Sequence, residues 1–378
     1  MTNTTLAHVT PEVLRWARES SGYSLQDAAR AIGVYAYQIQ MAEEGVEYLT
    51  LRQAEGLAKL YERPLAVLFA PDAPDEEPQE VQFRRLPGSP EPPWPSAMRL
   101  LARRITARQE AAIELYEAIE ETPPWLREAE HFADSDPDAL PEAARNALGV
   151  SPEEQAQWAD VYTPLRGWVD AVEAQGVLVM QDGSLGLGDM RGFASVEPRE
   201  APAIVVNTHD DPRARAFTVV HEFGHVVRAA LGLSVGPAAE AWCNQFAAEV
   251  LMPPDWFVEE FGRSSAPTLL ARVEALARTF SVTPLAAAVR VARLELAPRD
   301  EANAVIAHIE RRGEGPGRPP GGGGYYLNQI VDFGPGYIRL VFDALDANAV
   351  TYPTASGLLG GVKVDNLAKL RETLARRT

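Results

Sequence analysis

The chain has 378 residues, of which 46% are hydrophobic and 23% are charged, so it can build sizeable cores and is neither disordered nor fibrous. Its 35 basic and 53 acidic residues give a formal net charge of -18, which disfavours long-range attraction to nucleic acid or to an anionic membrane. A single cysteine excludes an internal disulfide, and we find neither a secretory signal nor an apolar run of about 18 residues, so we expect a cytoplasmic protein without membrane contact.

The first 70 residues predict a compact set of short helices. Capping residues and glycines place these helices at about 11–20, 24–33, 35–44, 50–61 and 65–69. Two helices joined by a short turn that contains glycine are the pattern of a helix-turn-helix. We therefore expect an all-α helix-turn-helix domain over residues 1–70.

Prolines dominate the next segment, residues 71–95. Its eight prolines cannot lie inside helices or central strands, so we predict a linker or an extended strap, in which residues 81–86 could dock onto the rest of the protein. Residues 96–164 are predicted to be a helical connecting region with a long helix over 98–121.

Residues 165–300 combine helices with strands. After a helix at 164–175, short β-rich runs separated by turn residues predict strands at 176–181, 192–196 and 203–207. Asp211 and Pro212 then supply an N-cap and a first helical residue, which predicts a helix that ends before Gly232. Pro237 begins the next helix, and further helices follow to about Leu296.

The C-terminal part begins with a Gly/Pro-rich spacer, residues 301–324. Residues 325–378 predict a small α/β region, with two strands followed by a helix from Asp365. We expect this region to be a cap or a dimerisation element, which leaves a homodimer open. The fold class expected for the whole chain is α+β, mostly helical.

The motif His-Glu-x-x-His occupies residues 221–225, inside the best-capped predicted helix. His221 and His225 are four residues apart, so both imidazoles leave one face of the helix and can bind the same metal ion. Glu222 lies 100° away around the helix. A bound zinc ion lowers the pKa of water, and a carboxylate in this place can accept the proton. The sequence therefore predicts a zinc site with Glu222 as catalytic base; manganese is a second candidate metal.

The third ligand must come from outside this motif. Glu240 and Glu249, on the following helix, are nine residues apart and face opposite ways, so only one can reach the metal; we favour Glu240 and expect Glu249 to be solvated. Cys243 is either a ligand or, as we prefer, a small buried residue. Asn244 either orients a ligand or packs between helices. His209, just before the metal-binding helix, either contacts an oxyanion or is an ordinary loop residue.

Two stretches, F-T-V-V-H-E-F-G-H at 217–225 and E-A-W-C-N-Q-F-A-A-E-V-L-M-P at 240–253, resemble the ImmA/IrrE family of metallo-endopeptidases. The resemblance covers about residues 165–295 and implies a zincin-like peptidase domain with a small β-sheet over 165–300. It implies that His221, His225 and Glu240 bind zinc and that Glu222 is the general base. It further implies substrates that are repressors with helix-turn-helix domains.

Residues 12–69 resemble the Cro/C1-type (XRE) helix-turn-helix, on the residues S-L-Q-D-A-A-R-A-I-G at 24–33 and M-A-E-E-G at 41–45. Its recognition side chains would include Tyr35, Tyr37, Gln38 and Gln40. Residues 1–70 carry six basic and eight acidic residues, which is poor for binding phosphates. Both operator DNA and a protein therefore stay open as partners of this domain.

Two functions are consistent with these patterns. The first is a zinc endopeptidase that cleaves a helix-turn-helix repressor or an antitoxin and so controls stress, phage or toxin–antitoxin genes. The second is a DNA-binding regulator or antitoxin, with a toxin as partner, in which the peptidase fold senses metal or binds that partner.

Overall fold

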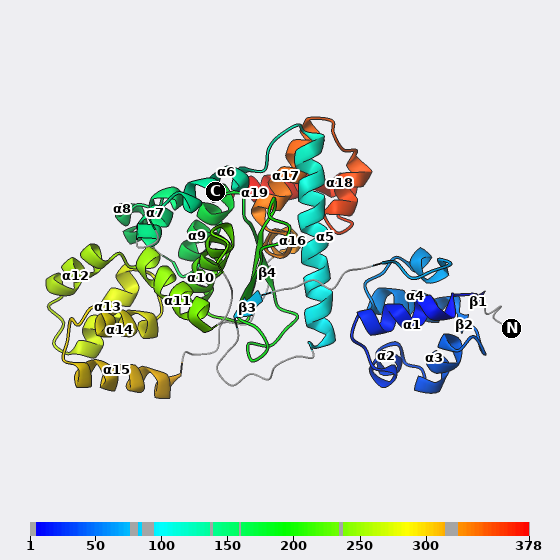
Figure 1. Cartoon of the computed structure of the whole chain (residues 1–378), viewed down its shortest axis with the longest axis horizontal. Helices are drawn as coiled ribbons and strands as arrows, with labels where there is room; N and C mark the ends of the chain where they lie inside the picture. The colour runs from blue at the N-terminus through cyan, green and yellow to red at the C-terminus, as the bar shows by residue number, and fades with distance from the viewer. Residues whose placement is uncertain are drawn as a thin grey trace. The chain divides into compact units, whose positions relative to one another are not determined.

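The computed structural model describes residues 5–75, 82–84, 94–136, 139–158, 160–233, 237–313 and 324–377, with residues 82–84 described by their backbone alone. The chain divides into two compact units, coloured from blue to red along the chain in Figure 1. Unit 1 consists of residues 1–80 and 90–106, and unit 2 of residues 81–89 and 107–378. None of the described helices is both long and apolar enough to cross a membrane.

Unit 1 is mostly helical, as its sequence predicts. Its elements are β1 (Leu6–Ala7), α1 (Pro11–Ser20), α2 (Leu25–Ile32), α3 (Ala36–Glu43), β2 (Leu49–Thr50), α4 (Leu51–Leu60), the 3-10 helix η1 (Leu65–Phe69) and the first half of α5 (Ser96–Ala118). The two short strands pair antiparallel, with Leu6 opposite Thr50. Between the helices lies a core that includes Leu14, Ile39 and Leu57.

Local capping explains where these helices begin and end. The Ser24 hydroxyl accepts a hydrogen bond from the Asp27 backbone N–H, and Gly33 ends α2 in the left-handed conformation that glycine adopts without strain. At the start of α1, however, the hydroxyl of Thr10 does not cap the helix as its position suggests. It donates to the carbonyl oxygen of Ala70 instead, which fixes the end of η1 against α1.

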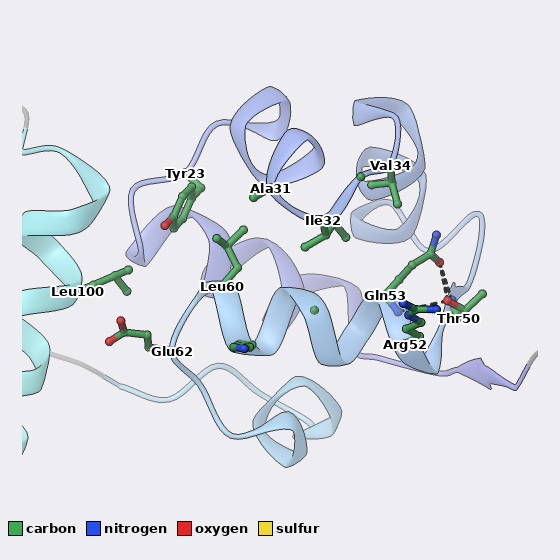
Figure 2. Close-up of a pocket in the computed structure, with 13 residues that line it drawn as sticks. Tyr23, Ala31, Ile32, Val34, Thr50, Arg52, Gln53, Leu60, Glu62 and Leu100 are labelled. Atoms are coloured by element: carbon green, nitrogen blue, oxygen red, sulfur yellow. Dashed lines mark hydrogen bonds between the residues drawn. The ribbon is translucent and has the colours of Figure 1, made fainter. Parts of the chain in front are cut away.

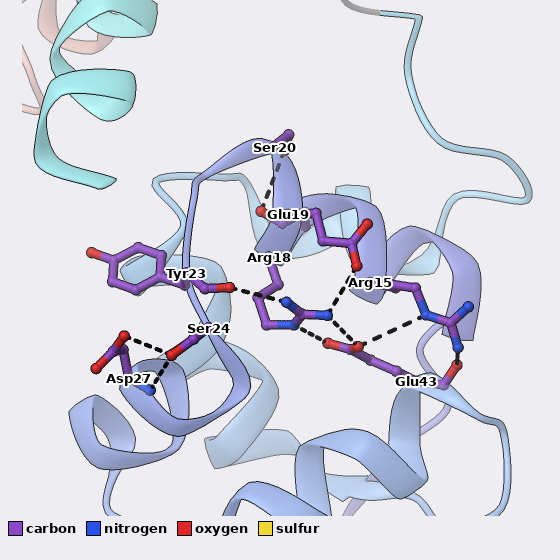
Figure 3. Close-up of polar contacts among 9 residues, drawn as sticks. Arg15, Arg18, Glu19, Ser20, Tyr23, Ser24, Asp27 and Glu43 are labelled. Atoms are coloured by element: carbon purple, nitrogen blue, oxygen red, sulfur yellow. Dashed lines mark hydrogen bonds and ion pairs between the residues drawn. The ribbon is translucent and has the colours of Figure 1, made fainter. Parts of the chain in front are cut away.

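A buried ion pair joins α1 to α3 (Figure 3). Arg18 donates two hydrogen bonds to the Glu43 carboxylate, at 2.7 and 2.9 Å, and a third to the carbonyl oxygen of Tyr23. The hydrogen bond to Glu43 raises the pKa of Arg18, so the guanidinium stays charged. Glu43 therefore orients α3, and its side chain is buried and not exposed to solvent.

Unit 2 surrounds one sheet with helices. Its elements in chain order are β3 (Gln82–Arg84), the second half of α5, α6 (Pro124–Ala133), α7 (Leu140–Leu148), α8 (Pro152–Ala156), α9 (Thr163–Ala174), β4 (Leu178–Asp182), β5 (Gly192–Ser195), β6 (Ala203–Asn207), α10 (Pro212–Ala230), α11 (Pro237–Leu251), α12 (Pro254–Arg263), α13 (Leu269–Thr279), α14 (Pro284–Arg293), α15 (Arg299–Arg312), α16 (Tyr325–Phe333), α17 (Pro335–Asp346), α18 (Tyr352–Leu358), the 3-10 helix η3 (Val364–Asn366) and α19 (Leu367–Ala375).

The sheet has the strand order β3-β5-β6-β4, in which β4 and β6 are parallel and the other pairs are antiparallel. Strands β4 to β6 match the three predicted β-rich runs, and every residue of β5 and β6 is buried. The edge strand β3 comes from the proline-rich segment and pairs with β5, so the expected docking of this segment is confirmed for residues 82–84. Helix α10 packs on β5 and β6, which places its central turns in the core.

The two strands expected after residue 325 are wrong: residues 324–377 contain α16 to α19, η3 and no strand. Runs rich in aromatic and β-branched residues suggested strands, but the buried side chains of α17 recur at helical spacing, as at Ile338, Val341 and Phe342. Helices α16 and α17 contact β4, the strand at the sheet edge away from β3. Their amphipathic faces thus cover this end of the sheet without extending it.

Glu173 belongs to α9, and its buried carboxyl group lies against the start of α17. Its side chain is 2% exposed, and it accepts a hydrogen bond from the backbone N–H of Gly336 and lies 3.4 Å from Arg339. A Cβ atom at Gly336 would lie 3.0 Å from the Glu173 carboxyl carbon, so a larger residue there would crowd this carboxyl group. Burial raises the pKa of Glu173 to about 8, against the opposing effects of Gly336 and Arg339.

We expect Glu173→Gln to stabilise the protein more at pH 8 than at pH 5. Because the carboxyl group titrates near 4.5 when unfolded and near 8 when folded, unfolding releases a proton between these values and rising pH favours the unfolded state. The neutral amide removes this dependence, so the stability gain grows by at most about 1.4 kcal/mol per pH unit over that range. Urea unfolding at several pH values measures it, with Glu130→Gln on the exposed face of α6 as control. A gain that does not vary with pH would contradict the prediction.

Candidate metal centre

The two histidines of the motif lie on α10, the long helix that crosses the core. Its first turn is capped by Asp211, whose carboxylate accepts a hydrogen bond from the backbone N–H of Arg213, and Pro212 follows as the first helical residue. One turn separates His221 from His225, and their ring centroids are 5.1 Å apart. The side chains are 0% and 5% exposed, so both rings have lost nearly all contact with solvent.

Glu240, in the first turn of α11, brings a carboxylate to both histidines. Its Oε2 lies 3.3 Å from His221 Nε2, and its Oε1 lies 3.1 Å from His225 Nε2. The ligand atoms of these three residues all lie within 4.8 Å of one another. Ligand atoms about 2.0–2.2 Å from a tetrahedral zinc ion would be about 3.3–3.6 Å apart, so two imidazoles and a carboxylate placed in this way fit such an ion.

The close packing of α10 on α11 brings Glu240 within reach of the two histidines. A Cβ atom at Gly224 would lie 3.0 Å from the Phe246 ring and 3.4 Å from the Cys243 sulfur. The absence of a side chain at Gly224 therefore lets Phe246 and Cys243 of α11 come close to α10. A larger residue at position 224 would push α11, and Glu240 with it, away from the histidines.

The far end of α11 is held by buried polar side chains. Arg145 donates to the carbonyl oxygen of Val250 at 2.7 Å, and Gln155 donates to that of Leu251 at 3.0 Å. Arg290 donates to the carbonyl oxygen of Met252 at 3.2 Å. These bonds satisfy carbonyls at the C-terminus of the helix, where two guanidinium groups also complement the helix dipole. Helix α11 is thus fixed along its axis, and so is the position of Glu240.

Glu222 is fully buried and faces β5. Its Oε1 lies 3.3 Å from the place where a Cβ atom of Gly192 would be, and the Thr218 methyl group lies 2.4 Å from that place. Only glycine therefore fits at position 192. Glu222 is one residue from His221 but is not part of the three-residue cluster that could hold a metal ion.

The electrostatics of the cluster favour an ionised Glu240. Burial by itself would raise the pKa of this carboxyl group, but the hydrogen-bonding and charge interactions with His221 and His225 outweigh it and lower the pKa. Burial, together with the charges of Glu222 and Glu240, raises the pKa of the Cys243 thiol. Cys243 lies outside the metal-binding cluster and fills the interface between the helices, the alternative that the sequence favoured.

The other residues considered as ligands or supports lie elsewhere. Glu249 is on the opposite side of α11, as expected, but it is not simply solvated, because it lies 3.7 Å from the buried Arg290. Asn244 is half-buried and makes no hydrogen bond through its side chain within the described residues. His209 is exposed, with its Nε2 2.9 Å from the carbonyl oxygen of Gly183, and does not join the cluster.

In unit 1, the recognition candidates are on the surface of α3. Tyr35 and Tyr37 are 72% and 56% exposed and stack with ring centroids 5.8 Å apart. Gln38 accepts a hydrogen bond from the Tyr35 backbone N–H, and Gln40 donates to Glu44, so both amides already make contacts within the helix region. None of the four lines the open groove of about 820 Å³ between α2 and α4, whose walls include Ile32, Arg52 and Leu60 (Figure 2).

The sequence did not indicate which residues hold the helices and strand around the candidate site in place. Gly192, Arg145 and Gln155 contribute through contacts with segments up to 125 residues away. No local pattern marks them, because a glycine at the start of a strand and a polar residue in a short helix are both common. The prolines and glycines around them predicted only where elements end.

Residues 172–292 match the family model of peptidase M78, the IrrE N-terminal-like domain. No curated protein and no solved structure matches the chain. The matched range contains β4 to β6 and α10 to α13. It also contains His221, Glu222, His225 and Glu240. This part of unit 2 is therefore similar to the metallopeptidases of the IrrE type.

Proposed function

We propose that unit 2 is a zinc-dependent endopeptidase. The observation that carries the proposal is the convergence of His221, His225 and Glu240 on one point, with the buried carboxylate of Glu222 beside it on the same helix. The match to a metallopeptidase family supports the same reaction class. Glu240 is 42% exposed, so the cluster is open to solvent and to a polypeptide on its side.

In the proposed reaction, zinc held by the two histidines and Glu240 would supply Lewis-acid stabilisation of the peptide carbonyl oxygen and lower the pKa of water. Glu222 accepts a proton from the attacking water as the water oxygen bonds to the carbonyl carbon. The same carboxylate then gives this proton to the leaving nitrogen as the C–N bond breaks. Its burial beside Gly192 keeps it in one orientation and excludes competing solvent.

Unit 1, by this proposal, selects the protein that unit 2 cleaves, such as a repressor or an antitoxin. Its α3 region presents exposed aromatic side chains, Tyr35, Tyr37 and Tyr48, next to the exposed acids Glu44 and Glu47. Aromatic residues are enriched at protein interfaces, whereas neutralising the phosphate charge of DNA requires Lys or Arg. A helix-turn-helix that binds protein thus accounts for this surface better than one that binds DNA.

Metal analysis tests the ligand set. We expect about one zinc ion per chain in the wild type and in Glu222→Gln, and loss of most of the metal in Glu240→Gln, since two imidazoles alone bind zinc more weakly. Elemental analysis after zinc loading and dialysis gives the stoichiometry, with Glu259→Gln on the exposed face of α12 as control. If Glu240→Gln kept its metal, the third ligand would have to be another residue.

Proteolysis tests the base. Zinc-loaded wild type should cleave unfolded casein or a peptide library, whereas Glu222→Gln, which keeps its metal, should lose at least about 100-fold in rate, as removal of a general base does. The new termini are identified by mass spectrometry. Equal cleavage by the two proteins would rule out Glu222 as the base and point to a contaminating protease.

DNA binding separates the two functions considered for unit 1. We expect the wild type to bind 30-base-pair duplexes, including one from its own promoter, only weakly. The Kd should lie above the range of about 1–100 μM that is typical of non-specific complexes. Glu44→Lys combined with Glu47→Lys should tighten binding and make it more salt-dependent, because both side chains are exposed. Fluorescence anisotropy measures this. Tight, sequence-dependent binding by the wild type would instead support the DNA-binding regulator.

A further inference from the structure

We infer that the groove between α2 and α4 of unit 1 binds an acidic amphipathic helix of a partner protein. The groove has a volume of about 820 Å³, and it is lined neither by the metal-centre residues nor by the tyrosines of the α3 surface. Its apolar walls, a glycine in α4 and two cations carry the inference. The inference goes beyond the proposed peptidase function, because it depends neither on metal nor on cleavage.

The walls of the groove are apolar. Ile32 and Val34, from the end of α2 and the turn that follows, form one wall, and Leu60 of α4 belongs to the other (Figure 2). All three side chains are half-buried and pack against the core of unit 1, so their positions are fixed while part of each still contacts water. An apolar side chain that entered between them would remove this surface from water, which is worth about 25 cal/mol per Å².

Gly56 lines the groove in the middle of α4. A Cβ atom at this position would lie 3.3 Å from the Ile32 Cγ2 atom, so even alanine would crowd Ile32. A glycine inside a helix costs about 1 kcal/mol relative to alanine, and the close approach of Ile32 accounts for its presence here. The space that glycine leaves over Ile32 is the place where a side chain of the partner would fit.

Two exposed cations, Arg52 and Lys59, lie along the α4 side of the groove. They are seven residues apart, which is two turns and about 10.5 Å along the helix, and Gly56 lies between them. Neither side chain makes an ion pair or a hydrogen bond with any of the described residues. Both charges are therefore available to a ligand.

The other basic side chains in residues 5–75 are engaged within unit 1. Arg15 and Arg18 pair with Glu43, Arg30 pairs with Asp27, and Arg63 lies over the Trp16 ring. Glu62, an acid in the lining of the groove, is paired with Arg104 at 2.7 Å. The charge that the groove offers to a ligand is thus positive, although residues 1–70 as a whole are acidic.

A helix with two acids seven residues apart matches this pattern. Its carboxylates would meet Arg52 and Lys59, and an apolar residue three or four positions after the first acid would enter over Gly56. The net charge of -18 repels such a helix elsewhere on the chain, so the two cations also fix where and in which register it binds. Phosphates of a nucleic acid would meet the same cations but would leave the apolar walls without a partner.

The probe is a fluorescent, alanine-rich peptide of about 14 residues, held helical by a staple on its far face. It carries two glutamates seven residues apart, with leucines at the third and fourth positions after the first glutamate. A second peptide has lysines in place of the glutamates. Anisotropy with the full chain at about 0.15 M salt should show saturable binding of the glutamate peptide below about 1 mM and weaker binding of the lysine peptide.

A charge swap tests the two cations. Arg52→Glu with Lys59→Glu should weaken binding of the glutamate peptide at least about tenfold and make the lysine peptide the tighter ligand, because like charges then face each other in the first complex only. The control is Arg299→Glu with Arg311→Glu, on the exposed surface of α15. It changes the net charge by the same amount and should leave the affinities for both peptides unchanged.

A second variant tests the apolar part without changing charge. Gly56→Leu places a side chain over Ile32 and should also weaken binding of the glutamate peptide at least about tenfold. Far-UV circular dichroism and thermal unfolding show whether this variant folds. If it does not, the charge swap decides, since Arg52 and Lys59 are exposed.

Three results would overturn the inference. The first is the absence of saturable binding of the glutamate peptide to the wild type, or equal affinity in the charge-swapped chain. The second is a 30-base-pair duplex that displaces the peptide and loses affinity in the charge-swapped chain, which would assign the cations to nucleic acid. The third is a wild-type dimer that the charge swap dissociates in sedimentation velocity, which would make a second copy of this chain the occupant.

Discussion

The close approach of α10 to α11 is the constraint on which the candidate centre depends. His221 and His225 are placed by one helix, but two imidazoles leave a tetrahedral ion incompletely held. Glu240 completes the set only because Gly224 lets Cys243 and Phe246 come close to α10. A glycine inside a helix costs about 1 kcal/mol relative to alanine, so its place here is explained by packing and not by helix stability.

Contacts at two further places hold α10 and α11 at this distance. The sheet supports α10 from one side, where Gly192 receives the Glu222 carboxylate. At its C-terminal end, α11 is held by Arg145, Gln155 and Arg290 through backbone carbonyl oxygens. Burying two arginines is unfavourable unless they are hydrogen-bonded, and burial does lower their pKa, in the case of Arg145 to about 10. These residues therefore hold the C-terminal end of α11 in place at a cost in burial of charge.

The two units differ in how they use charge. In unit 1 the Glu43 carboxylate pairs with Arg18 and so joins α1 to α3, whereas Glu44 and Glu47 are exposed near tyrosines. In unit 2 Glu222 is fully buried, Glu240 is partly exposed beside the two histidines, and Glu173 is buried where α17 begins. The net charge of -18 disfavours long-range attraction to nucleic acid.

The sequence by itself determined the helices of unit 1, strands β4 to β6 and α10 with its paired histidines, because capping, alternation and a four-residue spacing act within one turn or one strand. It favoured Glu240 over Glu249 and Cys243 as the third candidate ligand, and the packing of α11 brings Glu240 to the histidines. It was wrong about the two strands expected after residue 325, because β-branched and aromatic residues there form helices, of which α16 and α17 cover β4; the helix expected from Asp365 matches α19. The roles of Gly192, Arg145 and Gln155 were decided by the tertiary structure alone, since each depends on segments far away in sequence that meet only when the core forms.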